Sequence, residues 1–315
     1  MTAPPSLVPA VGRRRAYLHT VGTLAVLVIA AYLARRHWPT VETGAVRLSV
    51  ADHGWLLLGA TAAIATWAAS ALAQQGAVPR RLPGGRLFAA QFAASAANHV
   101  LPAGLGAGAV NIRFLMRCGL PAGHAASALA VKATAGGVAR GILIAALALV
   151  CPGLLSLPHI PPAVFAVVPA ALVLPAVLSR TPLWPRCRRA LQTVLADIRA
   201  VHANPSRALS LWGGSFAFAA MHSLVVIAVS QAVELPLPPV RVALLYLAAS
   251  SAAALLPTPG GIGSLDAALA FALTAGGAPG AAAASVVLGY RLLTVWLPLV
   301  PGLLVLGVLV RRKEL

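Results

Sequence analysis

Long apolar runs are the feature of this 315-residue sequence that most restricts what the chain can fold into. A helix needs about 20 consecutive, mostly apolar residues to cross the hydrocarbon core of a bilayer. Runs of about that length or longer occupy residues 17–34, 54–73, 124–150, 161–179, 208–233 and 281–310. Since 59% of all residues are hydrophobic and only 10% are charged, the sequence predicts an integral membrane protein and not a soluble domain.

Two further apolar regions, residues 87–115 and 242–274, are each interrupted by prolines and glycines. The interruptions read LPAGLGAG at residues 101–108 and LPTPGGIG at residues 256–263. Proline removes an amide donor and glycine weakens a helix, so both motifs predict a helix break at membrane depth. Because lipid cannot satisfy the freed backbone groups, we expect each break to be buried in protein or to line a wet cavity. The expected break residues are Pro102, Gly104, Gly106, Pro257, Pro259, Gly260, Gly261 and Gly263.

The two broken regions share a layout that predicts an internal repeat. In each, a short apolar piece follows the break, then a Gly/Pro turn, and then a long apolar run that carries a cation. Lys132 follows Pro121, and Arg291 follows Pro279, at similar distances. The first region is entered from an arginine-rich loop and the second from the opposite side, so the two units have opposite orientations. Such an inverted repeat places a transporter's site near the membrane midplane, between the repeats. The alternative is a pair of ordinary spans joined at the surface, but residues 265–274 are too few to span.

The sequence therefore predicts an all-α, polytopic membrane protein with about six full spans, two re-entrant broken-helix hairpins and an inverted-topology repeat. We expect residues 1–16 and 311–315 to be cytoplasmic tails and residues 17–310 to form a single transmembrane domain. The expected repeat halves cover about 87–179 and 208–310, joined by a cytoplasmic amphipathic connector at 180–207. Within it, residues 188–203 have helical periodicity, and either a helix lying on the membrane or a plain connector helix fits.

Arginine placement predicts the orientation of the chain. The formal net charge is +18 and nearly all of it is arginine, concentrated at residues 80–86, 180–207 and 311–312. The positive-inside rule puts these segments, and with them both termini, on the cytoplasmic side of a bacterial cytoplasmic (inner) membrane. Arg35, Arg36 and Arg47 then lie outside, against the rule. No soluble basic face carries aromatic residues for nucleic acid, so the expected partners are membrane lipids with anionic head groups.

Charged residues inside the apolar regions are the candidate binding residues. A central cation costs about 3 kcal/mol on insertion scales, so Lys132, Arg140 and Arg291 need a compensating role. We expect Lys132 and Arg291 to hold an anionic head group, with structural ion pairing as the alternative. Asp266 is the one acidic residue in an apolar setting. It either complements the dipole of a helix capped by Ser264 or balances a buried cation. The remaining head-group candidates are Asn98, His99, Asn111, Arg113 and Tyr290.

Metal-dependent and enzymatic functions find little support. Cys118, Cys151 and Cys187 form no CxxC or Cys/His pattern, and the histidines form no HExxH motif. We therefore expect no metal site, no disulfide framework and no cofactor. A lone carboxylate at membrane depth, without a paired acid or base, favours a protein that is not an enzyme.

The last third of the sequence resembles the lysylphosphatidylglycerol synthase transmembrane-region family, a flippase-like group of membrane proteins. The resemblance is carried by LLPTPGGIGSLDAAL at residues 255–269 and YRLLTVWLPLVPG at residues 290–302. It extends over about residues 54–310, with Asp266 where the family usually has glutamate and Lys132 where it usually has arginine. The soluble aminoacyl-transferring domain of the bifunctional synthases is absent from this sequence, so the resemblance implies the flippase-like part alone.

These observations predict a transporter-like membrane protein that binds and translocates an anionic lipid or a polyprenyl-phosphate-linked molecule. Because no nucleotide-binding motif is present, we expect a gradient or lipid asymmetry to drive it. One alternative is an accessory membrane protein for a lipid-modifying or glycosyltransferase partner enzyme. Another is a membrane-embedded lipid transferase.

Overall fold

The computed structural model describes residues 38–100, 105–151, 184–254, 263–312 and 314–315. Within these ranges, four helices are long and apolar enough to cross a membrane. They are α3 (His53–Ala77), α6 (Ala122–Val150), α9 (Pro205–Ala232) and the continuous helix Gly280–Arg311. These confirm four of the six expected long helices as all-α elements of a multi-pass membrane protein. The runs at 17–34 and 161–179 lie outside the described residues.

Six shorter helices complete this part of the chain: α2 (Trp38–Ser49), α4 (Gly84–Val100), α5 (Leu105–Arg117), α8 (Trp184–His202), α10 (Pro239–Ala254) and α11 (Ser264–Ala275). The long C-terminal helix consists of α12 (Gly280–Arg291), a π-helical turn (Leu292–Trp296) and α13 (Leu297–Arg311). The amphipathic stretch at 188–203 is the helix α8, as its periodicity predicts.

Local sequence signals explain where the long helices begin. The Asp52 carboxylate accepts from the Trp55 amide at 2.9 Å and caps α3, and Asn204 caps α9 ahead of Pro205. Proline stands directly before both α6 and α12, and each proline follows a turn with a glycine at positive φ, namely Gly119 and Gly277. The two halves of the chain thus use the same start signal for corresponding helices.

Both predicted breaks separate two helices. α4 ends at Val100 and α5 begins at Leu105, while α10 ends at Ala254 and α11 begins at Ser264. Gly106 lies in the first turn of α5, where a Cβ atom would overlap the backbone of Ala97 in α4. Gly263 caps α11 at φ 87°, a conformation that glycine adopts without strain. The other break residues, Pro102, Gly104, Pro257, Pro259, Gly260 and Gly261, lie outside the described residues.

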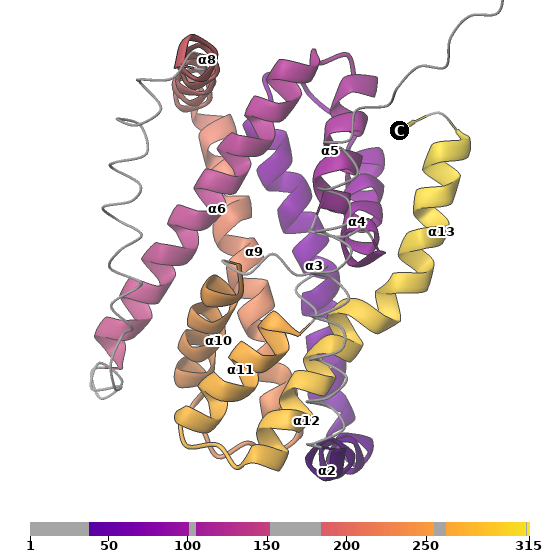
Figure 1. The fold of residues 1–315 in the computed structure, drawn as a ribbon, viewed down its shortest axis with the longest axis vertical. Coiled ribbons are helices and arrows are strands. Elements are labelled where there is room, and N and C mark those ends of the chain that lie inside the picture. The colour runs from indigo at the N-terminus through magenta and orange to yellow at the C-terminus, as the bar shows by residue number, and fades with distance from the viewer. Residues whose placement is uncertain (1–37, 101–104, 152–183, 255–262, 313) are drawn as a thin grey trace, which may run out of the picture.

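The two ends of the α4–α5 hairpin lie at the same end of the molecule. Arg80, just before α4, donates from Nη1 to the Cys118 carbonyl, just after α5, at 2.8 Å. An ion pair of 2.7 Å between Arg86 and Glu314 brings the C-terminus to the same end, where α8 also lies (Figure 1). The basic segments 80–86, 184–207 and 311–312 therefore gather at one end of the helices, as expected of segments on one side of a membrane.

The helix contacts form two matching sets. α3 contacts α4 and α6, as α9 contacts α10 and α12, and the order α4–α5–α6 packs as α10–α11–α12 does. Across the halves, α4 packs on α13 and α10 on α6, while α2 packs on α12 and α8 on α6. Figure 1 shows α3 and α9 running in opposite directions, and the two hairpins at opposite ends. The corresponding contacts also include α2, α3, α8 and α9.

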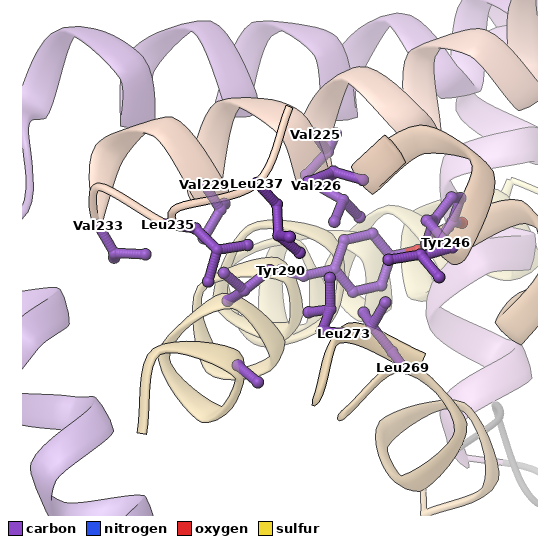
Figure 2. Packing of buried hydrophobic residues seen from close by; sticks show 14 of the residues in the cluster. Val225, Val226, Val229, Val233, Leu235, Leu237, Tyr246, Leu269, Leu273 and Tyr290 are labelled. Atoms are coloured by element: carbon purple, nitrogen blue, oxygen red, sulfur yellow. The ribbon is translucent and has the colours of Figure 1, made fainter. Parts of the chain in front are cut away.

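The central pair α3–α9 packs through small residues. A Cβ atom on Gly214 would lie 2.7 Å from the Ala69 carbonyl oxygen, and one on Gly76 would lie as close to the Arg207 oxygen. One apolar cluster joins α9, α10, α11 and α12 and includes Val225, Leu245, Leu269 and Tyr290 (Figure 2). A second, around Leu87, Phe114, Leu115 and Leu309, joins α4 and α5 to α13.

We expect Gly214→Ala to lower the stability of the protein in detergent by about 1–3 kcal/mol, because the added methyl group meets the α3 backbone. The adjacent Gly213 faces open space, so Gly213→Ala should leave the melting temperature unchanged or raise it. Thermal unfolding of the two purified variants checks this expectation. Equal melting temperatures for both would contradict the close approach of α3 and α9.

Candidate functional site

A polar cavity of about 300 Å³ lies among α3, α4, α5, α6, α9 and the π-helical turn. A second cavity of about 370 Å³ adjoins it and shares Ser70, Lys132 and Phe218 with the first. The polar residues that line the first are Thr66, Ser70, Gln91, Ser95, Asn98, Asn111, Lys132, His222 and Thr294. Both halves of the molecule thus contribute to one polar space at the depth of the long helices.

Lys132 lies where the two cavities meet, and neutral groups hold its ammonium. Nζ donates to Ser70 Oγ and to Gln91 Oε1, both at 2.9 Å. The Gln91 amide donates in turn to Asn111 Oδ1 at 2.6 Å, and the Asn111 amide donates to the Ala107 carbonyl at 2.8 Å. In the described ranges, no carboxylate forms an ion pair with Lys132. An ammonium has three donors, and these contacts occupy two of them.

Arg140 adds a second positive charge to this space. It lies about two turns further along α6 and lines the second cavity. Its Nε atom is buried and has no hydrogen-bond partner among the residues that the structure describes. None of the ion pairs found in those residues includes Arg140, and no carboxylate lines either cavity. The field in the cavities is therefore positive.

Arg291, by contrast, has a carboxylate partner. Its Nε donates to Asp266 Oδ1, and the Arg291 side chain is only 7% exposed. The other oxygen of Asp266 accepts from the Gly263 amide at 2.8 Å. The helix cap is therefore Gly263, and the expectation of a cap at Ser264 was wrong by one residue, because glycine takes the positive φ at this position. Asp266 both caps α11 and ties it to α12.

A second hydrogen-bonded chain leads from the first cavity into the second half of the molecule. His222, which lines the cavity, has its Nδ1 atom 3.1 Å from the Tyr290 hydroxyl. That hydroxyl lies 3.0 Å from the hydroxyl of Tyr246. The π-helical turn begins two residues after Tyr290. Thr294 in this turn donates to the Tyr290 carbonyl at 2.7 Å and lines the same cavity. Such turns are frequent at functional sites.

The structure brings some of the predicted head-group residues together and leaves others apart. Lys132, Arg140, Asn98 and Asn111 line the two cavities. Tyr290 reaches the space through His222, and the Arg291–Asp266 pair is adjacent to Tyr290 along α12. Arg113 is exposed on α5. His99 lines a small crevice between α4 and α13 beside Pro298.

Sequence reasoning missed Ser70, Gln91, His222 and Tyr246. Each lies among mostly apolar neighbours in a helix that also has other polar residues, and such residues usually bond to their own helix or pack in the core. The signal that could have found them is their spacing, which only becomes informative once the helix starts are known. In the described part of the chain, no group of three or more His, Cys, Asp or Glu residues could hold a metal ion.

Comparison with known protein families gives a match over most of the chain. The model of the protein family described as lysylphosphatidylglycerol synthase TM region matches residues 19–302. The match includes both hairpins and every residue that lines the two cavities. No curated protein matches the chain.

The Arg291–Asp266 pair generates a testable expectation for stability. Removing either partner takes the opposite charge away from a buried or partly buried group, so Arg291→Met or Asp266→Asn alone should cost about 3 kcal/mol. The double variant should lose clearly less than the sum of the two single losses. Thermal unfolding in one detergent gives all four values. Arg113→Met, which removes an exposed arginine, is the control and should change stability by less than about 0.5 kcal/mol. Additive losses in the double variant would contradict the pairing.

Proposed function

Because the chain belongs to the lysylphosphatidylglycerol synthase TM region family, we propose that it binds and translocates lipids with anionic head groups, or polyprenyl-phosphate-linked molecules, through the cavity around Lys132. One observation carries the proposal. Lys132 is an intramembrane cation that opens onto a polar cavity and has neutral hydrogen-bond partners in place of a carboxylate. A phosphate group is a ligand that fits such a site, because it accepts hydrogen bonds from an ammonium and balances its charge.

The contrast between two cations in the same molecule supports this assignment. Arg291 is stabilised by Asp266, as expected of a cation that holds helices together. Lys132 and Arg140 lie next to cavity space, and the described residues supply neither with an ion-pair partner. A head-group phosphate would complete the hydrogen bonding of Lys132 and neutralise the positive field. Its release would restore the empty, positively charged state.

The matching halves supply a route across the membrane. α5 has 13 residues and α11 has 12, which is about 20 and 18 Å of helix against a hydrocarbon core of about 30 Å. In our proposal the α4–α5 and α10–α11 hairpins enter the bilayer from opposite faces and end near its centre. Asn98, close to the first break, lines the cavity, and Asp266, close to the second, contacts Arg291. Rocking of one half against the other would then expose the head-group site to either side.

The proposal places the protein in the bacterial cytoplasmic membrane, with its basic end, which includes Arg80, Arg86 and Arg312, in the cytoplasm. A role as an accessory protein for a lipid-modifying enzyme would leave the polar cavity and its cations without use. A transferase would need an acid–base pair, and the carboxylate of Asp266 is engaged with Arg291.

Lys132→Met keeps the length of the side chain and removes its charge. We expect this variant to move fluorescently labelled phosphatidylglycerol across proteoliposomes at least about tenfold more slowly than the wild type, because a charge-assisted hydrogen bond to phosphate is lost. Quenching of the outer-leaflet label by dithionite gives the rates.

Thr134→Ala is the matched control, because Thr134 is exposed on the same helix and bonds only to the Ala130 carbonyl. It should transport at the wild-type rate, and gel filtration should show that both variants are folded. A Lys132→Met protein with the wild-type rate would refute the role of Lys132. A wild-type protein that moves neither phosphatidylglycerol nor a polyprenyl phosphate would refute the proposed function and favour the accessory role.

A further inference from the structure

Two hydrogen-bonded triads occupy corresponding places in the two halves. The first consists of Ser70, Gln91 and Lys132 on α3, α4 and α6. The second consists of His222, Tyr246 and Tyr290 on α9, α10 and α12. In each triad, one residue bonds to both of the others. In the first triad this residue is Lys132 on α6, and in the second it is Tyr290 on α12. The same three helix positions are therefore used twice.

The positions agree residue by residue. Ser70 and His222 each stand seventeen residues after the first residue of their helices, α3 and α9. The second members each stand seven residues after the start of α4 and α10, and the third members ten after the start of α6 and α12. Three coincidences among helices whose contacts also correspond make the triads equivalent sites of the repeat. Lys132 therefore corresponds to Tyr290, which follows Pro279 at the same distance as Lys132 follows Pro121, and Arg291 stands one position further along.

The two triads share a cavity but differ in charge. All three members of the first triad line it, and His222 of the second lines it as well. The first triad presents an ammonium, whereas the second presents an imidazole backed by two buried phenols (Figure 2 shows Tyr246 and Tyr290 within the apolar cluster). One space thus has a cation at one site and an uncharged hydrogen-bonding group at the other.

Hydrogen-bond counting defines what the second triad recognises. If Tyr290 donates to Nδ1 of His222, then Nε2 of that ring carries a proton and donates; if Nδ1 donates, Nε2 accepts. No described residue forms a hydrogen bond with Nε2, and the ring borders the cavity. Nε2 can therefore act as donor or acceptor as the two phenol protons reorient. A hydroxyl group, which both donates and accepts, matches such a partner in either state.

Other head groups match this arrangement less well. An ammonium group only donates, and in this cavity it would face the charges of Lys132 and Arg140 with no lining carboxylate to offset them. A trimethylammonium group neither donates nor accepts. A phosphate with a hydroxyl-bearing substituent uses both triads at once.

We propose that His222, Tyr290 and Tyr246 form a second head-group subsite, which binds a hydroxyl group of the lipid whose phosphate lies at Lys132. This inference rests on the proposed function and narrows its substrate to anionic lipids with an uncharged, hydroxyl-bearing head group, such as a glycerol or a sugar. Aminoacylated, cationic head groups are not substrates. The two halves of the repeat then recognise two chemically different parts of one head group.

A pair of lipids with equal charge tests the subsite. Phosphatidylglycerol and phosphatidylethanol carry the same phosphate charge, but only the first has free hydroxyl groups. In proteoliposomes we expect the wild type to move tail-labelled phosphatidylglycerol roughly five- to tenfold faster than phosphatidylethanol. Tyr290→Phe and His222→Leu should each reduce the phosphatidylglycerol rate to that of phosphatidylethanol. Gel filtration of each variant checks that it is folded.

The outcomes separate the two proposals. Equal wild-type rates for both lipids, or a preference that survives in Tyr290→Phe, would overturn the second subsite and leave transport at Lys132 standing. Transport of lysylphosphatidylglycerol at the phosphatidylglycerol rate would overturn the restriction to uncharged head groups. If the wild type moves neither phosphatidylglycerol nor phosphatidylethanol, the proposed translocation of such anionic lipids is refuted, and the proposed subsite is refuted with it.

Discussion

The lack of water across a bilayer is the constraint on which the rest of this structure depends, because every polar group at membrane depth needs a partner within the protein. Several serines on α9 meet it by bonding to their own backbone, as Ser215 does to the Leu211 carbonyl at 2.7 Å. Arg291 meets it with Asp266. Lys132 meets it only in part, with neutral oxygens beside open space. We therefore propose the site at Lys132, because its hydrogen bonds to the described residues leave one donor of its ammonium for a ligand.

The sequence predicts the elements of this fold better than their mutual arrangement. Apolar run length and Gly/Pro breaks are local properties, so α3, α6, α9, the C-terminal helix and both interruptions could be predicted. Which polar residues meet depends on how each helix is rotated and where it crosses its neighbours. Lys132 bonds to Ser70 and Gln91, which lie 62 and 41 residues away in the chain. No periodicity within one helix contains that information.

The two halves illustrate how one backbone arrangement can hold different chemistry. Corresponding helices make corresponding contacts, yet the cation of the first half is replaced by a tyrosine in the second. The second half also has the ion pair Arg291–Asp266. Counted from the first residues of the corresponding helices, Arg291 matches Ala133 of α6 and Asp266 matches Ala107 of α5, so the first half has no such pair there. Small residues such as Gly214 let α3 and α9 approach closely and so hold this arrangement of helices together. The polar positions inside this arrangement are free to diverge.

The π-helical turn at Leu292–Trp296 has a consequence for how the chain can change in length. A turn closed by i to i+5 bonds takes in one more residue than an α-helical turn, so it acts as a one-residue insertion within a continuous helix. Deleting one residue there would convert the turn to α-helix and leave the face of α13 that packs on α4 almost unchanged. Deleting one residue from the α-helical stretch between Leu297 and Gly302 would instead turn the rest of α13 by about 100° about its own axis. Gly302, which now faces Ala96 of α4, would then point elsewhere.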